Sequence, residues 1–267
     1  ALSRQLSNEE RRKAIVAGIA GGFGAVFGTP LAGASFALEA PNPLRPQWGG
    51  LLPALIAAGL GHLTCIHLGV THTDYRSLIG ERIPFELSTL LLAVAVGIAG
   101  GGAARLFVFS IHGMKRTYGR IDDPVLRAAV GAIAVVAVTM VLGTRVYNGL
   151  SIPLLVSAFD QPAVVYAFAI KLGLTVLTLG AGMKGGEVTP LFVIGGTLGS
   201  AIAGLAGLDP AAGAAMGFCA VFAGAARVPV ACMFMGLELF GPGAAIPAAL
   251  SCGLAFLVAG REGIYGR

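Results

Sequence analysis

Long runs without a charged side chain alternate with short charged connectors along this chain. The runs cover residues 14–38, 87–104, 128–144, 188–208, 210–226 and 239–260. Their lengths approach the roughly 20 apolar residues that cross a bilayer as a helix. The pattern therefore predicts an all-α protein with several membrane-spanning helices.

Glycine and proline interrupt several of these apolar runs. Backbone that is broken at membrane depth needs hydrogen-bond partners from protein or from a water-filled cavity, so we expect a bundle of tilted and discontinuous helices. The chain has 41 glycines in 267 residues, roughly twice the usual share of about 7%. Because small residues let membrane helices approach closely, the bundle should be tightly packed.

Composition supports a membrane protein. Hydrophobic residues make up 56% of the chain and charged residues 12%, whereas a soluble domain has about 25% charged residues. The net charge of +5 comes largely from connectors, chiefly residues 11–13 and 115–127. The positive-inside rule places such clusters at the cytoplasmic side of a lipid bilayer, which disfavours nucleic acid as a partner.

Cysteine and histidine offer no clear metal site. The cysteines lie singly in apolar segments and are predicted to be buried free thiols that pack as small hydrophobes; they are Cys65, Cys219, Cys232 and Cys252. His62, His67 and His72 are spaced by five residues, which does not stack them on one helix face. We therefore expect structural or interfacial histidines and no bound metal.

Two stretches resemble each other: "AVFGTPLAGASFALE" (residues 25–39) and "GAARVPVACMFMGLE" (residues 224–238). Pro30 pairs with Pro229 and Glu39 with Glu238, each 199 residues apart. Transporters commonly contain such duplications, often inverted across the membrane; the alternative is coincidence between two segments rich in alanine and glycine. Because each glutamate ends an apolar segment, we expect it to find a structural partner at an interface or a helix end.

The stretch "GMKGGEVTPLFVIGGTLGS" (residues 182–200) introduces charge just before an apolar, glycine-spaced run. Pro190 suits the first turn of a helix, since the N–H that it lacks is unpaired there anyway. Thr189 is then expected as the N-cap. The amides at the positive end of this helix would form a site for an anion.

Glu187 adds an ionisable group to that site. Burial and a neighbouring anion both favour the protonated carboxyl, which can donate a hydrogen bond to the anion and transfer a proton. This chemistry would link anion binding to proton binding. The alternative is that Glu187 pairs with Lys184 or caps a helix at a wet interface.

Three motifs in order now resemble one known family. "AGIAGGFGAVFGTPLAGASFALE" and "MGFCAVFAGAARVPVACMFMGLELFG" are similar to the two repeat-related helix pairs of the CLC chloride channels and antiporters. "GMKGGEVTPLFVIGGTLGS" is similar to the GGxFxP anion-binding segment of that family. The resemblance covers the whole chain and implies the CLC fold, with inverted repeats and discontinuous helices.

The form GGEVTP resembles the bacterial fluoride/proton antiporter branch of the family. That resemblance implies anion-binding roles for Gly186, Glu187, Val188 and Thr189, and a proton-coupling role for Glu187. It also matches Tyr265, in "GIYGR", to the tyrosine whose hydroxyl reaches the central anion site. Without the resemblance, Tyr265 would be interpreted as a membrane-interface anchor.

Departures from the family pattern refine these expectations. Ala40 stands where the chloride/proton exchangers have an inward-facing proton glutamate, which leaves Glu187 as the available coupling carboxylate.

The family's gating segment would precede Ala1, where the repeat also places the mate of Glu187. We therefore expect one transmembrane domain over residues 1–267 that lacks the N-terminal part of the first repeat and has no cytosolic regulatory domain.

The resulting hypothesis is a homodimeric, multi-pass protein of a prokaryotic cell membrane that exports fluoride in exchange for protons. A chloride/proton exchanger or chloride channel of the same fold is the nearest alternative, and a non-transporting membrane scaffold is an alternative of another class. No GxSxG, HExxH or paired-aspartate signature indicates an enzyme, and no motif implies a cofactor.

Overall fold

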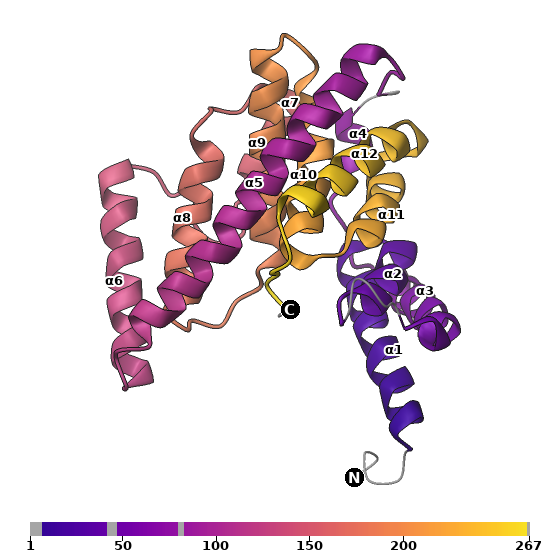
Figure 1. Ribbon diagram of the computed structural model, residues 1–267, viewed down its shortest axis with the longest axis horizontal. Coiled ribbons are helices and arrows are strands. Elements are labelled where there is room, and N and C mark those ends of the chain that lie inside the picture. The colour runs from indigo at the N-terminus through magenta and orange to yellow at the C-terminus, as the bar shows by residue number, and fades with distance from the viewer. Residues whose placement is uncertain (1–6, 42–46, 80–82, 266–267) are drawn as a thin grey trace.

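A computed structural model of the chain describes residues 7–41, 47–79 and 83–265 as a bundle of helices (Figure 1). In the part of the chain described, the helices are α1 (Asn8–Phe27), α2 (Pro30–Glu39), the 3₁₀ helix η2 (Trp48–Gly50), α3 (Leu51–His67), α4 (Tyr75–Ile79), α5 (Leu87–Tyr118), α6 (Pro124–Leu142), α7 (Ile152–Asp160), α8 (Ala167–Gly180), α9 (Val188–Leu205), α10 (Pro210–Ala226), α11 (Pro229–Phe240) and α12 (Pro242–Val258). The predicted all-α class is confirmed.

The apolar runs form helices where the hydrophobic pattern predicts them. Four helical segments among the described residues are long and apolar enough to cross a membrane: Trp48–His67, Leu87–Tyr118, Pro124–Leu142 and Val188–Leu205. Helix α5 extends well beyond the uncharged run that predicted it, because a single Arg105 does not interrupt helical hydrogen bonding. Charge therefore marks the end of an apolar run without marking the end of its helix.

Two pairs of consecutive helices are separated by breaks at equivalent points of the repeat. Helix α1 ends at Gly28 in a left-handed conformation, and α2 begins two residues later at Pro30. Helix α10 ends at Arg227, also left-handed, and α11 begins at Pro229. The predicted discontinuous helices are thus confirmed as two matching pairs, α1–α2 and α10–α11.

The two pairs exchange equivalent hydrogen bonds. The Glu238 carboxylate accepts the N–H groups of Leu31 and Ala32 at 2.8 and 2.9 Å. The Glu39 carboxylate accepts those of Val230 and Ala231 at 3.1 and 2.7 Å. Each glutamate ends one helix and binds the first turn of its repeat mate, as the prediction of a helix-end partner required.

Helices α9 and α10 pack backbone against backbone. Each has two glycines four residues apart on the contact: Gly195 and Gly199 on α9, Gly213 and Gly217 on α10. A Cβ atom added at any of the four would lie 1.9 to 2.3 Å from a backbone carbonyl oxygen of the facing helix. The close approach predicted from glycine content is therefore realised at this pair.

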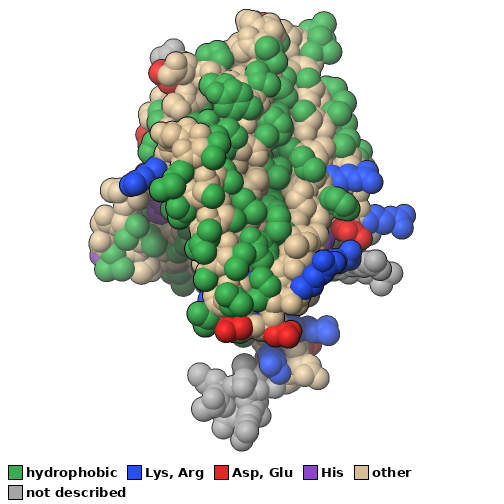
Figure 2. All heavy atoms as spheres, turned by 90° about the vertical axis from the view of Figure 1, so that its left-hand side faces the viewer, with side chains coloured by type: hydrophobic (Ala, Val, Ile, Leu, Met, Phe, Trp, Pro, Cys, Tyr) green, Lys and Arg blue, Asp and Glu red, His purple; other side chains and the backbone are tan. Residues whose placement is uncertain are grey.

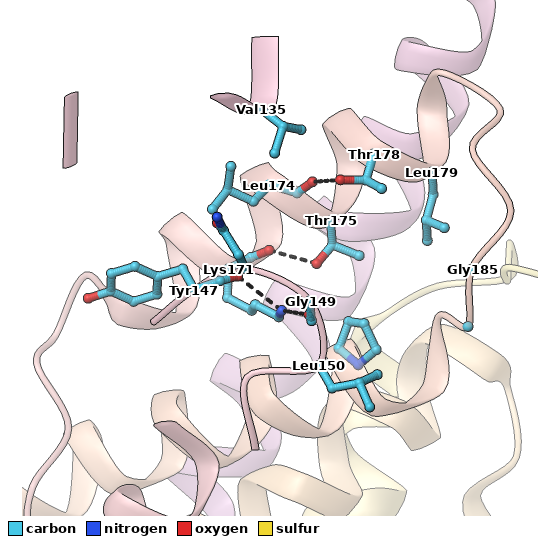
Figure 3. A pocket seen from close by; sticks show the side chains of 13 residues that line it. Val135, Tyr147, Gly149, Leu150, Lys171, Leu174, Thr175, Thr178, Leu179 and Gly185 are labelled. Atoms are coloured by element: carbon cyan, nitrogen blue, oxygen red, sulfur yellow. Dashed lines mark hydrogen bonds between the residues drawn. The ribbon is translucent and has the colours of Figure 1, made fainter. Parts of the chain in front are cut away.

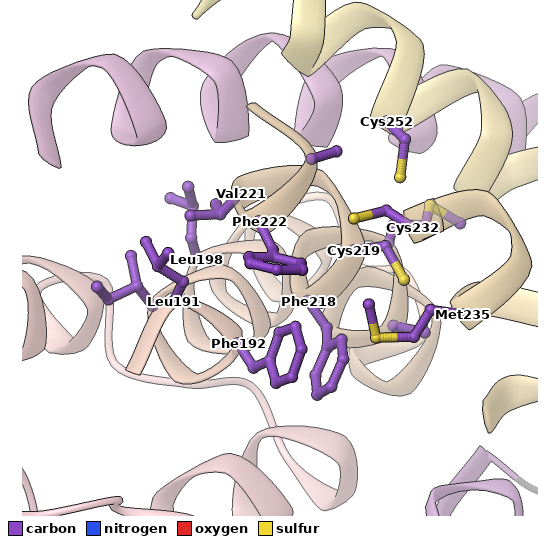
Figure 4. Packing of buried hydrophobic residues seen from close by; sticks show 14 of the residues in the cluster. Leu191, Phe192, Leu198, Phe218, Cys219, Val221, Phe222, Cys232, Met235 and Cys252 are labelled. Carbon is purple, nitrogen blue, oxygen red and sulfur yellow. The ribbon is translucent and has the colours of Figure 1, made fainter. Parts of the chain in front are cut away.

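The same pair contributes to the aromatic and thiol core (Figure 4). The rings of Phe192 and Phe218 stack with centroids 3.9 Å apart. Cys219, Cys232 and Cys252 are free thiols fully buried beside them. The predicted role of these three as small buried hydrophobes is confirmed, and this packing fixes the position of α9. The prediction of burial is wrong for Cys65, which is only partly buried because most of α3 lies outside the core.

The outer face of α6 matches a lipid environment. Figure 2 shows apolar side chains over the side of the molecule where α6 lies, with charged side chains gathered toward its lower end. The side chains of Val125, Ile133 and Met140 on α6 are 75%, 69% and 77% exposed. Such a face is stable only against an apolar phase, so the predicted membrane environment suits it.

Candidate functional site at the start of helix α9

Helix α9 begins earlier than the sequence predicted. Its N-cap is Glu187 and its first residue is Val188, so Thr189 is not the N-cap. Pro190 still lies in the first turn, as expected. The helix can begin two residues before proline because no N–H in the first turn has an intrahelical acceptor.

The amides at this helix start are free. Among the described residues, no hydrogen bond is donated by the N–H groups of residues 185–189, and the first bond of the helix runs from the Leu191 N–H to the Glu187 carbonyl at 3.1 Å. Several unpaired N–H groups at the positive end of a helix dipole favour an anion. The predicted anion-binding amides of Gly186, Glu187 and Val188 are therefore available together.

The Glu187 side chain is available for chemistry. It is half-buried, forms no cap hydrogen bond, and forms no ion pair with Lys184 or with any other described residue. Of the two structural alternatives, the pair with Lys184 is not observed among the described residues, and Glu187 occupies the N-cap position of α9 without a capping hydrogen bond from its side chain. Lys115, exposed near the end of α5, is the cation whose field reaches the Glu187 carboxyl.

Two cavities border this segment. One, of 270 Å³, is lined by Gly185, Gly186 and Pro190 together with residues of α6 and α8 (Figure 3). The other, of 370 Å³, is lined by Thr189 and by His72 from the segment before α4. Leu150 borders both, so the two cavities adjoin at this loop residue. Residues at the start of α9 line each of them, although Glu187 itself lines neither.

Tyr265 follows α12, at the C-terminal end of the described residues. Its ring packs edge-on against Phe36 with centroids 5.9 Å apart, and the Glu187 charge acts on its phenol. The side chain is 46% exposed, and its hydroxyl bonds to no described residue. Glu187 and Tyr265, distant in sequence, therefore lie within electrostatic reach of each other.

The histidines form structural contacts. His72 lies beyond the end of α3, and its ring Nε2 donates to the Ala25 carbonyl in the last turn of α1 at 2.7 Å. Its ring centroid is 6.0 Å from that of His62. The spacing of five residues was judged as if all three histidines lay on one helix, and His72 does not lie on α3. Its hydrogen bond agrees with the expected structural role.

Lys171 is a buried cation that the sequence analysis missed. Only 2% exposed, it extends from α8 and donates to the carbonyls of Tyr147 and Gly149 at 3.1 and 2.5 Å and to the Ser151 hydroxyl at 2.9 Å (Figure 3). All three ammonium protons are thus used. The sequence could have indicated this role, because Lys171 is a single lysine inside an apolar stretch. Ionisable residues at membrane depth are rare and need a partner.

Lys171→Met is expected to destabilise the protein by about 2–3 kcal/mol, since it leaves buried acceptors unsatisfied. The loop that lines the 270 Å³ cavity beside the glycines loses its anchor to α8. Thermal unfolding in detergent measures the effect. Lys184→Met, at an exposed lysine, is the matched control, and equal shifts for both variants would contradict the role assigned to Lys171.

Comparisons with known proteins agree with this geometry. A family model described as "Voltage gated chloride channel" matches residues 1–260. The chain is 41% identical to a "Chloride/fluoride channel protein" of Pseudomonas syringae pv. tomato over 98% of its length and 59% of that protein. It is 27% identical to an "H(+)/Cl(-) exchange transporter ClcA" of Yersinia pestis over 88% of its length and 52% of that protein.

Solved structures show the same fold. A CLC-type fluoride/proton antiporter superimposes with a TM-score of 0.87 at 34% identity, covering 92% of this chain and 62% of the other. A slow cyanobacterial Cl⁻/H⁺ antiporter superimposes with a TM-score of 0.79 at 20% identity, covering 98% of this chain and 65% of the other. With the paired broken helices and the free amides at α9, these matches place the chain in the voltage-gated chloride channel family.

Proposed function

We propose that the full-length protein exports fluoride across the cell membrane of a prokaryote in exchange for protons, as a homodimer. The observation that carries this proposal is the half-buried carboxyl of Glu187, which has no partner among the described residues, at a helix start whose amides donate to none of them either. The similarity to a fluoride/proton antiporter supports the choice of ion. We assign the protein no catalytic activity.

Fluoride is a small and strongly hydrated anion, so removing its water requires strong hydrogen-bond donors. The amides of Gly186, Glu187 and Val188 provide donors at the positive end of α9. We assign further donors to the hydroxyls of Thr189 and Tyr265. A protonated Glu187 completes the set, because a carboxylic acid donates a strong hydrogen bond to an anion.

Proton coupling follows from two states of Glu187. In one state the protonated carboxyl binds fluoride, and in the other it releases its proton to cytoplasmic water. Burial of the Glu187 carboxyl favours its protonated state. The weaker field of Lys115, which lies in the last turn of α5 in the cationic stretch assigned to the cytoplasmic side, favours the ionised carboxylate. Each proton that enters on Glu187 would therefore accompany the exit of fluoride.

Flux from proteoliposomes containing the full-length protein tests the ion. We expect fluoride efflux, followed with a fluoride electrode, to drive proton uptake, followed with a trapped pH dye. Chloride is the comparison ion and should move far more slowly. Chloride flux comparable to fluoride flux would replace the proposal with a chloride/proton exchanger, which the similarity to the Yersinia transporter favours as the second candidate.

A further inference from the structure

Arg227 occupies a backbone position that ordinarily suits glycine. It ends α10 at φ +64°, and its equivalent in the first repeat is Gly28, at φ +69°. A side chain in this left-handed region is unfavourable compared with glycine. The local backbone therefore gives no reason for arginine, and the reason must lie in its side chain.

The Arg227 guanidinium binds the end of α12. Its Nη1 donates to the Phe256 carbonyl at 2.7 Å and to the Gly260 carbonyl, and its central carbon lies 3.7 Å above the centre of the Phe256 ring. A cation at a helix C-terminus also stabilises the negative end of the helix dipole. Arg227 thus fixes where the chain leaves α12.

The next residues lie along the end of α10. The Ile264 N–H donates to the Ala225 carbonyl at 2.9 Å. Gly263 is buried between them, and a Cβ atom there would lie 2.7 Å from Arg227 Cγ and 3.2 Å from the Ala225 carbonyl oxygen. The segment before Tyr265 is therefore held against α10 by the arginine and by one backbone hydrogen bond.

Tyr265 has few contacts of its own. Its ring meets Phe36, and its hydroxyl bonds to no described residue. The position of Tyr265 thus depends on the anchored residues that precede it. We propose that Arg227 is a positioning residue that holds the Tyr265 hydroxyl at the anion path by fixing the end of α12. This inference rests on the proposed role of Tyr265 in fluoride binding.

Arg227→Gly is the informative substitution, because glycine suits the left-handed backbone and removes only the side chain. In full-length protein in proteoliposomes, we expect it to raise the KM for fluoride about tenfold, as loss of one anion hydrogen bond would. In a Tyr265→Phe background, the same change should raise KM less than about twofold, because both changes remove one interaction. Arg227→Lys, which can still bind one carbonyl, should be intermediate.

Equal KM increases in both backgrounds would overturn the proposal, since Arg227 would then act independently of Tyr265. An unchanged KM in the otherwise native protein, with Tyr265→Phe raising it, would also overturn the proposal. Elution as a single species in detergent establishes that each variant is folded.

A second measurement, tryptophan fluorescence, reports on the position of residue 265 without relying on fluoride transport. In full-length protein with Tyr265→Trp, in which Trp48 and any tryptophan outside residues 1–267 are replaced by phenylalanine, the indole reports the surroundings of position 265. Adding Arg227→Gly should shift its emission to longer wavelength, and an unchanged spectrum would overturn the proposal. If the spectrum shifts while Tyr265→Phe leaves the fluoride KM unchanged, positioning by Arg227 stands and the proposed role of Tyr265 fails.

Discussion

Glu187→Gln in the full-length protein is expected to reduce proton movement driven by fluoride by about 100-fold or more, the usual scale for loss of a proton-transferring group. Glutamine has nearly the same shape and can still donate a hydrogen bond to an anion, but it cannot bind and release a proton. Downhill fluoride flux should persist without the accompanying pH change. Simultaneous electrode and pH-dye recordings from one vesicle preparation measure both.

The local structure makes this substitution a clean test. The Glu187 side chain forms no cap hydrogen bond and no ion pair with a described residue, so glutamine removes no structural contact there. Glu86→Gln is the matched control, because Glu86 is an exposed carboxylate at the N-cap of α5 that likewise forms no cap bond. Coupled flux that survives Glu187→Gln unchanged would refute proton transfer by Glu187.

Much of the fold could be predicted from the sequence because membrane helices leave strong one-dimensional signals. Uncharged runs predicted α6, α9, α10 and α12, the interrupting glycines and prolines predicted discontinuous helices, and the repeated Pro and Leu-Glu positions predicted an internal duplication. These features depend on local backbone preference and on the exclusion of charge from lipid. Both can be identified from the composition and from the spacing of residues along the chain.

Contacts between distant segments could not be predicted in this way. The acceptors of Lys171 lie in the loop between α6 and α7, and the carbonyls bound by Arg227 lie in the last turn of α12 and just beyond its end. Each residue type was visible in the sequence, but its partner is defined only by packing. The start of α9 was misplaced because proline is permitted at several positions of a first turn, so Pro190 did not define one boundary.

Glu39 and Glu238 join the two repeats more strongly than their sequence positions alone indicated. Each carboxylate uses both oxygens on two adjacent amides of the opposite helix start. Hydrogen bonds from N–H groups to a charged acceptor contribute about 1.5–3 kcal/mol each, more than neutral ones. Because Glu39 is only 4% exposed, water cannot replace its carboxylate as the hydrogen-bond acceptor of these N–H groups.

Glu39→Gln is therefore expected to destabilise the protein by about 2–4 kcal/mol, since the new amide group places a donor against the Val230 or Ala231 N–H. Glu238→Gln should act in the same direction. The double variant should lose less than the sum, because both carboxylates stabilise one contact between α2 and α11. Thermal unfolding in detergent measures the stability of all three variants. Glu9→Gln, at an exposed ion pair, is the control, and its loss of stability should be less than about 1 kcal/mol. Fully additive losses would show that each carboxylate stabilises only the helix start that it binds, and that the exchange does not join the repeats.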